Sequence, residues 1–183
     1  MRRQSAFVEK VISALFIVPS SMLATVSALS AQNLGAGKEK RTTDTLHYAT
    51  VITTIYGMIV AVLIQFIAEN VVGIFTSDTT VVTMGSAYIR SYIWDCIFAG
   101  MHFSFSGYFC AYGRSEISFI HNLIAILCVR IPGVYLTSKF FPDTLFPMGL
   151  ATATGSLLSV IICVIFFGWL KRRERSRKKI TSV

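Results

Sequence analysis

Charged residues are scarce in this 183-residue sequence, and acidic residues are the scarcest of them. Only 14% of the residues are charged, and nine are Asp or Glu. Three stretches contain no Asp, Glu, Lys or Arg at all, namely 11–34, 45–68 and 144–170. Each exceeds the roughly 20 apolar residues that cross the hydrocarbon core of a bilayer. Buried helices of a soluble bundle would need a polar face, which these stretches lack, so we expect transmembrane helices.

The sequence also lacks the motifs of enzymes and of metal or nucleotide sites. No GK[ST] follows its glycines, its four cysteines form no CxxC pair, and no hydrolytic triad can be assembled. We therefore expect no enzyme, no metal and no cofactor. Seven of the 17 Lys and Arg residues lie between 171 and 179, directly after an apolar span. Such a run is typical of a cytoplasmic anchor at anionic membrane lipids, and no nucleic-acid partner is expected.

Two further stretches each carry a single charge. Segment 91–113 contains only Asp95, and segment 117–138 contains only Arg130. A lone charge does not prevent insertion of a helix of this length. The fold class is therefore an all-α polytopic bundle of five transmembrane helices, joined by short polar connections. The predicted membrane domain is 1–170, with helices at about 6–34, 45–68, 86–113, 117–138 and 145–170, followed by a basic tail, 171–183.

Basic residues near the span ends predict the orientation. Eleven Lys and Arg gather on one side, at 38–41, at Arg114 and in the tail, against five on the other side. The richer side should be cytoplasmic, so the C-terminus is predicted inside and the N-terminus outside. An outside start with the sequence Met-Arg-Arg is unusual, and it suggests that further membrane segments precede Met1.

One string at the end of the first span is the most informative motif. It comprises Gln32, Asn33, Gly35, Gly37 and Arg41, and on local physics it predicts a helix stop with a tight turn. The pattern QNxGAGxxxR resembles the multidrug and toxic compound extrusion (MATE) transporters. The string Gly73-Ile74-Phe75-Thr76-Ser77-Asp78, the glycines at 107 and 113, and Val129-Arg130-Ile131-Pro132 are similar to further motifs of that family, in family order.

The resemblance implies a twelve-helix exporter of two six-helix lobes, of which these spans would be the eighth to twelfth. Its activity would be antiport of drugs or small organic cations against protons or sodium across the plasma membrane. The partner implied is the missing N-terminal lobe with its preceding helices. Two alternatives remain open: a small membrane subunit that pairs with a separately encoded half, and a flippase of lipid-linked substrates.

Asp95 and Arg130 are the two charges well inside apolar spans. Counted from the cytoplasmic helix ends at about 1.5 Å per residue, they lie at depths of about 27 Å and about 21 Å. Intramembrane charges are functional candidates by default. Asp95 is expected either to couple transport to an ion or to neutralise Arg130, and a structural ion pair is the favoured interpretation for Arg130. Snorkelling of Arg130 to the interface is its alternative.

Three other residues are candidates for a cavity or a hinge. Pro19 and Pro132 interrupt apolar helices, and each removes a backbone hydrogen bond, which kinks a helix. His102, like His121, is a single histidine within a span, for which a core histidine bonded to a neighbour is favoured over a proton relay.

Overall fold

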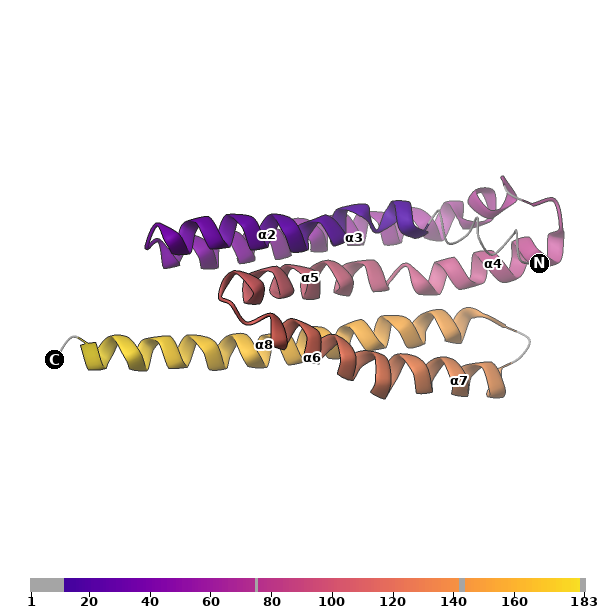
Figure 1. Cartoon of the computed structure of the whole chain (residues 1–183). Helices are drawn as coiled ribbons and strands as arrows, with labels where there is room; N and C mark the ends of the chain where they lie inside the picture. The colour runs from indigo at the N-terminus through magenta and orange to yellow at the C-terminus, as the bar shows by residue number, and fades with distance from the viewer. Residues whose placement is uncertain (1–11, 75, 142–143, 182–183) are drawn as a thin grey trace.

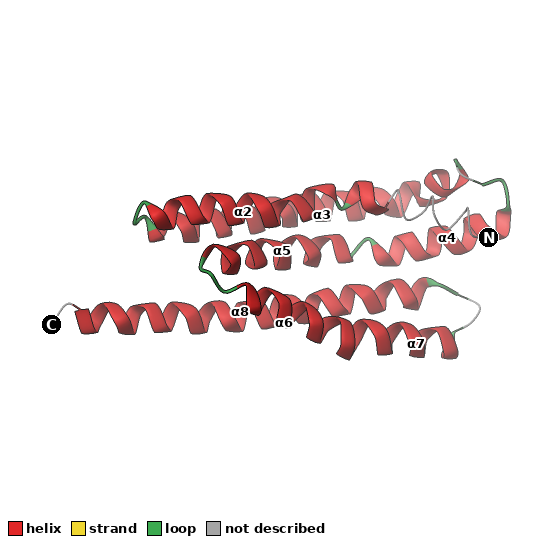
Figure 2. Ribbon diagram, viewed as in Figure 1, coloured by secondary structure: helices red, strands yellow, loops and turns green. Residues whose placement is uncertain are grey.

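The structure is a computed structural model that describes residues 12–74, 76–141 and 144–181, with side chains described as far as 173. Every regular element in this part of the chain is a helix (Figure 2). The elements are α2 (Ile17–Gly35), α3 (Glu39–Gly73), α4 (Thr79–Tyr92), α5 (Asp95–Ala111), α6 (Ser115–Ala125), the π-helical turn η1 (Ile126–Arg130), α7 (Ile131–Phe140) and α8 (Phe146–Thr181). Within these residues, three helices are long and apolar enough to cross a membrane, namely α3, the continuous 115–140 segment and α8.

In the described part of the chain, the elements form five antiparallel passes, namely α2, α3, α4–α5, α6–η1–α7 and α8 (Figure 1). The α2–α3 hairpin lies on one side, α4 and α5 lie in the middle, and α6, α7 and α8 lie on the other side. The central α5 packs against α2, α3, α6 and α8. The α2–α3 turn, the α5–α6 turn and the C-terminal end of α8 all lie at the same end of the bundle. This end carries the basic residues that predict the cytoplasmic side.

Small residues bring the central helix close to its neighbours. A Cβ added to Gly107 of α5 would meet the Leu23 carbonyl oxygen of α2 at 2.5 Å, and one added to Gly57 of α3 would meet the Ile97 backbone at 2.8 Å. Glycine at a helix interface permits such close approach of backbones in a membrane. The gain is van der Waals contact between helices.

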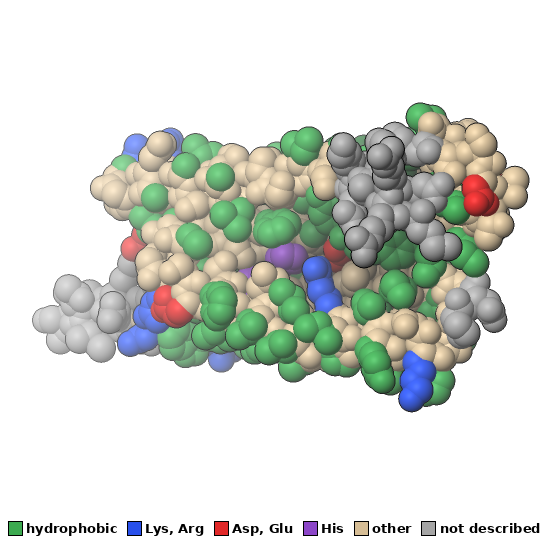
Figure 3. Space-filling model, turned by 45° about the vertical axis from the view of Figure 1, so that its right-hand side comes forward, with side chains coloured by type: hydrophobic (Ala, Val, Ile, Leu, Met, Phe, Trp, Pro, Cys, Tyr) green, Lys and Arg blue, Asp and Glu red, His purple; other side chains and the backbone are tan. Residues whose placement is uncertain are grey.

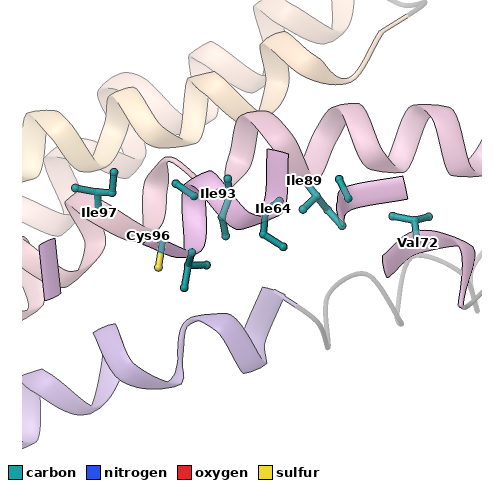
Figure 4. Close-up of a cluster of buried hydrophobic side chains, with 9 residues drawn as sticks. Ile64, Val72, Ile89, Ile93, Cys96 and Ile97 are labelled. Atoms are coloured by element: carbon teal, nitrogen blue, oxygen red, sulfur yellow. The ribbon is translucent and has the colours of Figure 1, made fainter. Parts of the chain in front are cut away.

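An apolar core joins α3, α4 and the start of α5 (Figure 4). The labelled side chains are Ile64, Val72, Ile89, Ile93, Cys96 and Ile97, and all are at most 9% exposed. Many apolar side chains on the outer faces of α3, α6 and α8 are exposed, as expected of helices that face lipid. The buried core therefore lies between helices, while the outer faces keep the apolar surface that a bilayer solvates.

The third predicted helix, 86–113, is wrong as a single helix. The chain forms α4 and α5 with a break at Ile93 and Trp94 between them. Around the break, the N–H groups of Cys96 and Ile97 bond three residues back instead of four. α4 also begins earlier than predicted, because Asp78 caps its N-terminus by accepting from the N–H groups of Thr80 and Val81.

The other boundaries also differ from the prediction. α3 extends beyond 45–68 at both ends, and the fourth helix runs from Ser115 to Phe140 with a π-helical turn inside it. α8 continues to Thr181, so the predicted tail is helical over 171–181 and is not a separate segment. The predicted start of the first helix, 6–11, lies outside the described residues, as do the tail's side chains from 174 on.

The motif that ends the first span forms a tight turn. Gly37 has φ of 70°, the Lys38 N–H bonds to the Asn33 carbonyl and the Gly37 N–H bonds to the Leu34 carbonyl. This is the Schellman pattern, which caps the last carbonyls of a helix. Gly113, with φ of 68°, ends α5 with the same two bonds, to Phe109 and Cys110. Glycine is needed at both positions because other residues rarely adopt this backbone conformation.

Candidate functional site: a buried ion pair at a helix break

Asp95 and Arg130 lie together inside the bundle. Arg130 Nη2 is 3.4 Å from Asp95 Oδ2, and it also donates a 2.5 Å hydrogen bond to Ser156 Oγ of α8. The Asp95 side chain is 2% exposed and the Arg130 side chain 29%. Three elements, α5, η1 and α8, therefore supply one carboxylate, one guanidinium and one hydroxyl at the same point.

The helix break positions the carboxylate. Asp95 is the first residue of α5, where the positive end of the helix dipole stabilises a negative charge. The break leaves the Arg90 carbonyl without its usual partner four residues on, and Gln65 of α3 donates to it at 3.0 Å. A single amide side chain thus satisfies one of the backbone groups that the break exposes.

The π-helical turn positions the guanidinium. The Ile131 N–H bonds to the Ile126 carbonyl, five residues back, directly before Pro132. Proline cannot donate a backbone hydrogen bond, and the wider turn accommodates its ring within a continuous helix. Pro132 therefore marks the η1–α7 junction beside Arg130. Gly155 of α8 completes the arrangement, since an added Cβ would lie 2.5 Å from Arg130 Cγ.

The pair retains free polar atoms. Asp95 Oδ1 and Arg130 Nε are buried and have no hydrogen-bond partner within the described part of the chain. Buried polar atoms usually have partners, so an unsatisfied carboxylate oxygen is an acceptor available to a cation or a proton. Arg130 also borders an open depression between α7 and α8, which is lined by Arg130, Ile131, Val134, Tyr135, Ser138 and Met148.

The other candidate residues lie away from the pair. Pro19 is buried near the start of α2, where its ring leaves the Leu15 carbonyl free, and this carbonyl accepts from the Tyr56 hydroxyl at 3.1 Å. The motif residues at 32–41 form the α2–α3 turn at the bundle end, so they shape a turn and do not line the ion pair. Arg41 lies in the first turn of α3 and is exposed.

A second polar cluster lies farther along α5. His102 is 3% exposed, and its ring centroid is 5.8 Å from that of His121 of α6. His121 contacts Ser106 Oγ at 2.9 Å and Ser159 Oγ at 3.3 Å. The prediction of a core histidine bonded to a neighbour fits His121, whereas His102 Nδ1 has no partner among the described residues. No signal in the sequence points to these serines, although Ser156 and Ser159 are three residues apart and share one face of α8.

The amino-acid sequence of the chain is similar to a known protein family and to a curated protein. The sequence profile of the MatE family matches residues 6–136. The chain belongs to the MatE family. It is 28% identical over 172 residues to Protein DETOXIFICATION 14 of Arabidopsis thaliana, covering 92% of this chain and 35% of that protein. The chain thus spans about a third of the length of the curated relative it matches.

A solved MATE structure has the same fold over nearly the whole chain. The crystal structure of the eukaryotic MATE transporter AtDTX14 matches with a TM-score of 0.76 and 26% identity, over 97% of this chain and 41% of that one. The predicted family and fold class, a multi-pass membrane protein with part of a MATE fold, are confirmed. The long apolar helices are thereby those of a MatE membrane domain.

Proposed function

We propose that this chain forms most of one lobe of a cation-coupled antiporter that exports drugs or small organic cations in exchange for protons or sodium. The other lobe would come from a further polypeptide segment, in the same chain or in a separate subunit. The membrane would be the plasma membrane, with the C-terminus on the cytoplasmic side. Membership of the MatE family and the names of the relatives support the reaction class.

The single observation that carries the proposal is the buried carboxylate at the helix break. Secondary transporters commonly hold coupling ions where a membrane helix is interrupted near the bilayer middle. Asp95 lies at such an interruption, in the outer half of the membrane by its depth of about 27 Å, and it offers one oxygen to Arg130 and keeps the other without a partner. An antiporter needs a site whose charge changes when the ion binds, and a carboxylate provides one.

The geometry suggests how binding would act on the helices. A proton or sodium ion at Asp95 would cancel the carboxylate charge and remove the Coulomb attraction that holds Arg130. Arg130 stays charged, so it would turn toward Ser156 and the open depression beside it. The α5 contact with the η1–α7 segment would loosen, and α5 could shift against α8. Release of the ion would restore the pair.

The proposal is tested by transport with and without a second lobe. We expect the chain alone to export no ethidium from proteoliposomes, because one lobe cannot alternate. Coexpressed with the first lobe of a MatE relative, it should export ethidium when a proton or sodium gradient is applied. Asp95→Asn should abolish that export.

Two results would contradict the proposal. Export by the purified chain alone would show that no second lobe is required. Export by the paired Asp95→Asn variant at the wild-type rate would remove Asp95 from coupling. Glu69→Gln is the matched control, because Glu69 is an exposed acidic residue of α3 that pairs with Arg90 outside this site. Its export should equal that of the unmodified pair.

A further inference from the structure

The hydrogen bonds of His121 fix its tautomer. Ser159 Oγ lies 3.3 Å from the His121 carbonyl oxygen and donates to it, so this hydroxyl can only accept from the ring. The Nδ1 atom of His121 therefore carries the hydrogen. Nε2 is then an acceptor, and it receives the hydroxyl hydrogen of Ser106 at 2.9 Å. His121 is thus a neutral imidazole held between one donor and one acceptor.

This arrangement continues toward the ion pair along two helices. On α5, Asp95, His102 and Ser106 are seven and four residues apart, which places them on one face of the helix. On α8, Ser159 and Ser156 are three residues apart, or about 4.5 Å along the axis. Ser156 is the hydroxyl that receives Arg130 and lies beside the Asp95 carboxylate.

All six polar residues of this set lie inside the bundle. His121, Ser106, Ser159 and Ser156 are each at most 3% exposed, as are His102 and Asp95. The charged groups facing the two imidazoles in the described residues are Arg130 of η1 and, beyond it, Asp95. Figure 3 shows a small purple histidine patch between green hydrophobic side chains, next to blue Lys or Arg side chains. Burying polar groups this completely costs free energy unless they hydrogen-bond to one another.

Resting on the proposed function, we infer that His121 transfers protons between the cytoplasmic half of the bundle and Asp95, by way of Ser106 on one side and Ser159 and Ser156 on the other. Proton would then be the coupling ion. Ser106 lies about 10 Å from the helix end at Gly113, whereas Asp95 lies about 27 Å from it. His121, Ser159 and Ser156 together would therefore cover the depth between Ser106 and the carboxylate.

The transfer balances in protons. Ser106 gives its hydroxyl hydrogen to His121 Nε2 and takes another from a hydronium ion on its cytoplasmic side, which leaves as water. His121 gives its Nδ1 hydrogen to Ser159, whose own hydrogen passes through water and Ser156 to the Asp95 carboxylate. The carboxylate becomes a carboxylic acid, and each hydroxyl and imidazole ends with the number of hydrogens it began with. The His102 Nδ1 atom, buried and without a partner among the described residues, offers a further acceptor beside this path.

The experiment measures how fast Asp95 is protonated, without any need for transport. The full chain is reconstituted in lipid bilayers, and light-released protons from a caged acid start the reaction. Infrared absorption of the protonated carboxyl group, identified by its loss in Asp95→Asn, reports the rate. In His121→Ala the rate should fall at least roughly tenfold, and added imidazole should restore it, because the free base replaces the missing ring. The equilibrium midpoint of the Asp95 band should not change.

Three further measurements complete the test. His47→Ala, at an exposed position of α3, should leave the rate unchanged. If His121→Ala does not fold, His121→Gln keeps the volume and one hydrogen bond on each side, and it should be slow without rescue by imidazole. An unchanged rate in either folded variant, or a slow rate in His121→Ala that imidazole does not restore, would overturn the relay. Failure of the relay would leave the proposed function intact, provided that the two-lobe protein still shows coupled export that depends on Asp95. Absence of that Asp95-dependent export would overturn the proposed function, whatever the protonation rate.

Discussion

At the scale of single residues, the Asp95–Arg130 pair is costly to keep. Each charge loses its hydration inside the bundle, and the 3.4 Å contact returns only part of that energy. A pair of apolar residues would pack there at lower cost, so stability alone does not explain these side chains. A coupling role does explain them, because a carboxylate that is only partly satisfied can exchange its arginine partner for an ion.

The pair should behave as one unit in mutagenesis. Asp95→Asn and Arg130→Gln should each destabilise the folded chain by about 3–5 kcal/mol, because each leaves an uncompensated buried charge. The double variant should recover part of this loss. Unfolding of the purified chain in mixed micelles measures all three. Strictly additive losses would mean that the two side chains do not interact. In a two-lobe transporter, the double variant should fold but not transport.

Gly155 should position Arg130 from across the helix interface. Gly155→Ala places a Cβ against the Arg130 stem and should cost about 1–3 kcal/mol by overpacking, while moving the guanidinium away from Asp95. Gly168→Ala is the matched control, since it lies in the same helix with no atom within 4 Å of the added Cβ. In the Asp95→Asn, Arg130→Gln background, the Gly155→Ala cost should shrink. An equal cost in both backgrounds would show that Gly155 acts without the pair.

The residues of the pair could be predicted from the sequence, but their partners could not. Two lone charges of opposite sign at similar depths in consecutive spans have few other ways to be neutralised. Ser156 gave no such signal, because α8 contains several small polar residues that can bond to their own helix backbone, as Thr152 and Thr154 do. Ser156 is distinguished by its hydrogen bond from Arg130 of another helix, and the sequence around Ser156 does not indicate that bond.

At the scale of helices, the interruptions position the functional side chains. The break before Asp95 and the π-helical turn before Ile131 lie in consecutive passes, and each ends at one member of the pair. Pro132 is visible in the sequence and predicts a local irregularity, although not its kind. The break at Ile93 and Trp94 contains neither proline nor glycine. It is stabilised by Gln65 from another helix, so no local pattern could predict it.

The α2–α3 turn allows a test of its glycines. Gly37→Ala should destabilise the chain by about 1–2 kcal/mol, because alanine is strained at a φ of 70°. Gly35→Ala, two residues earlier, lies in the helix with no atom near its added Cβ, and it should be neutral or slightly stabilising. Thermal unfolding of the two variants in the same detergent measures the difference. Equal stabilities would mean that the left-handed conformation is not required for the turn.

At the scale of the whole molecule, the five passes leave the two ends of the bundle chemically different. The predicted excess of basic residues falls at the end with the Gly37 and Gly113 turns, and Figure 1 shows α8 ending there too. This arrangement could be predicted from the sequence because charge-free stretches report spans directly. The contacts among the helices could not, since the outer and inner faces of the long helices α3 and α8 are almost equally apolar and the hydrophobic pattern does not say which face is buried.

The orientation is tested by labelling in intact cells. With the native cysteines replaced by serine, Lys40→Cys should resist a membrane-impermeant maleimide added outside, whereas Ser77→Cys should react. Both positions are exposed and lie in opposite end regions of the bundle. The reverse pattern would invert the proposed topology and place the basic end outside.

The length of α8 has a mechanical consequence. Its 36 residues extend about 54 Å, whereas the hydrocarbon core is about 30 Å thick. The part from Lys171 to Thr181 adds about 16 Å of continuous helix beyond the apolar segment. Because this extension continues the membrane-spanning helix, a small tilt of α8 within the membrane produces a larger displacement at Thr181. A fluorophore there would report rocking of the helix that carries Ser156 and Ser159, without touching either residue.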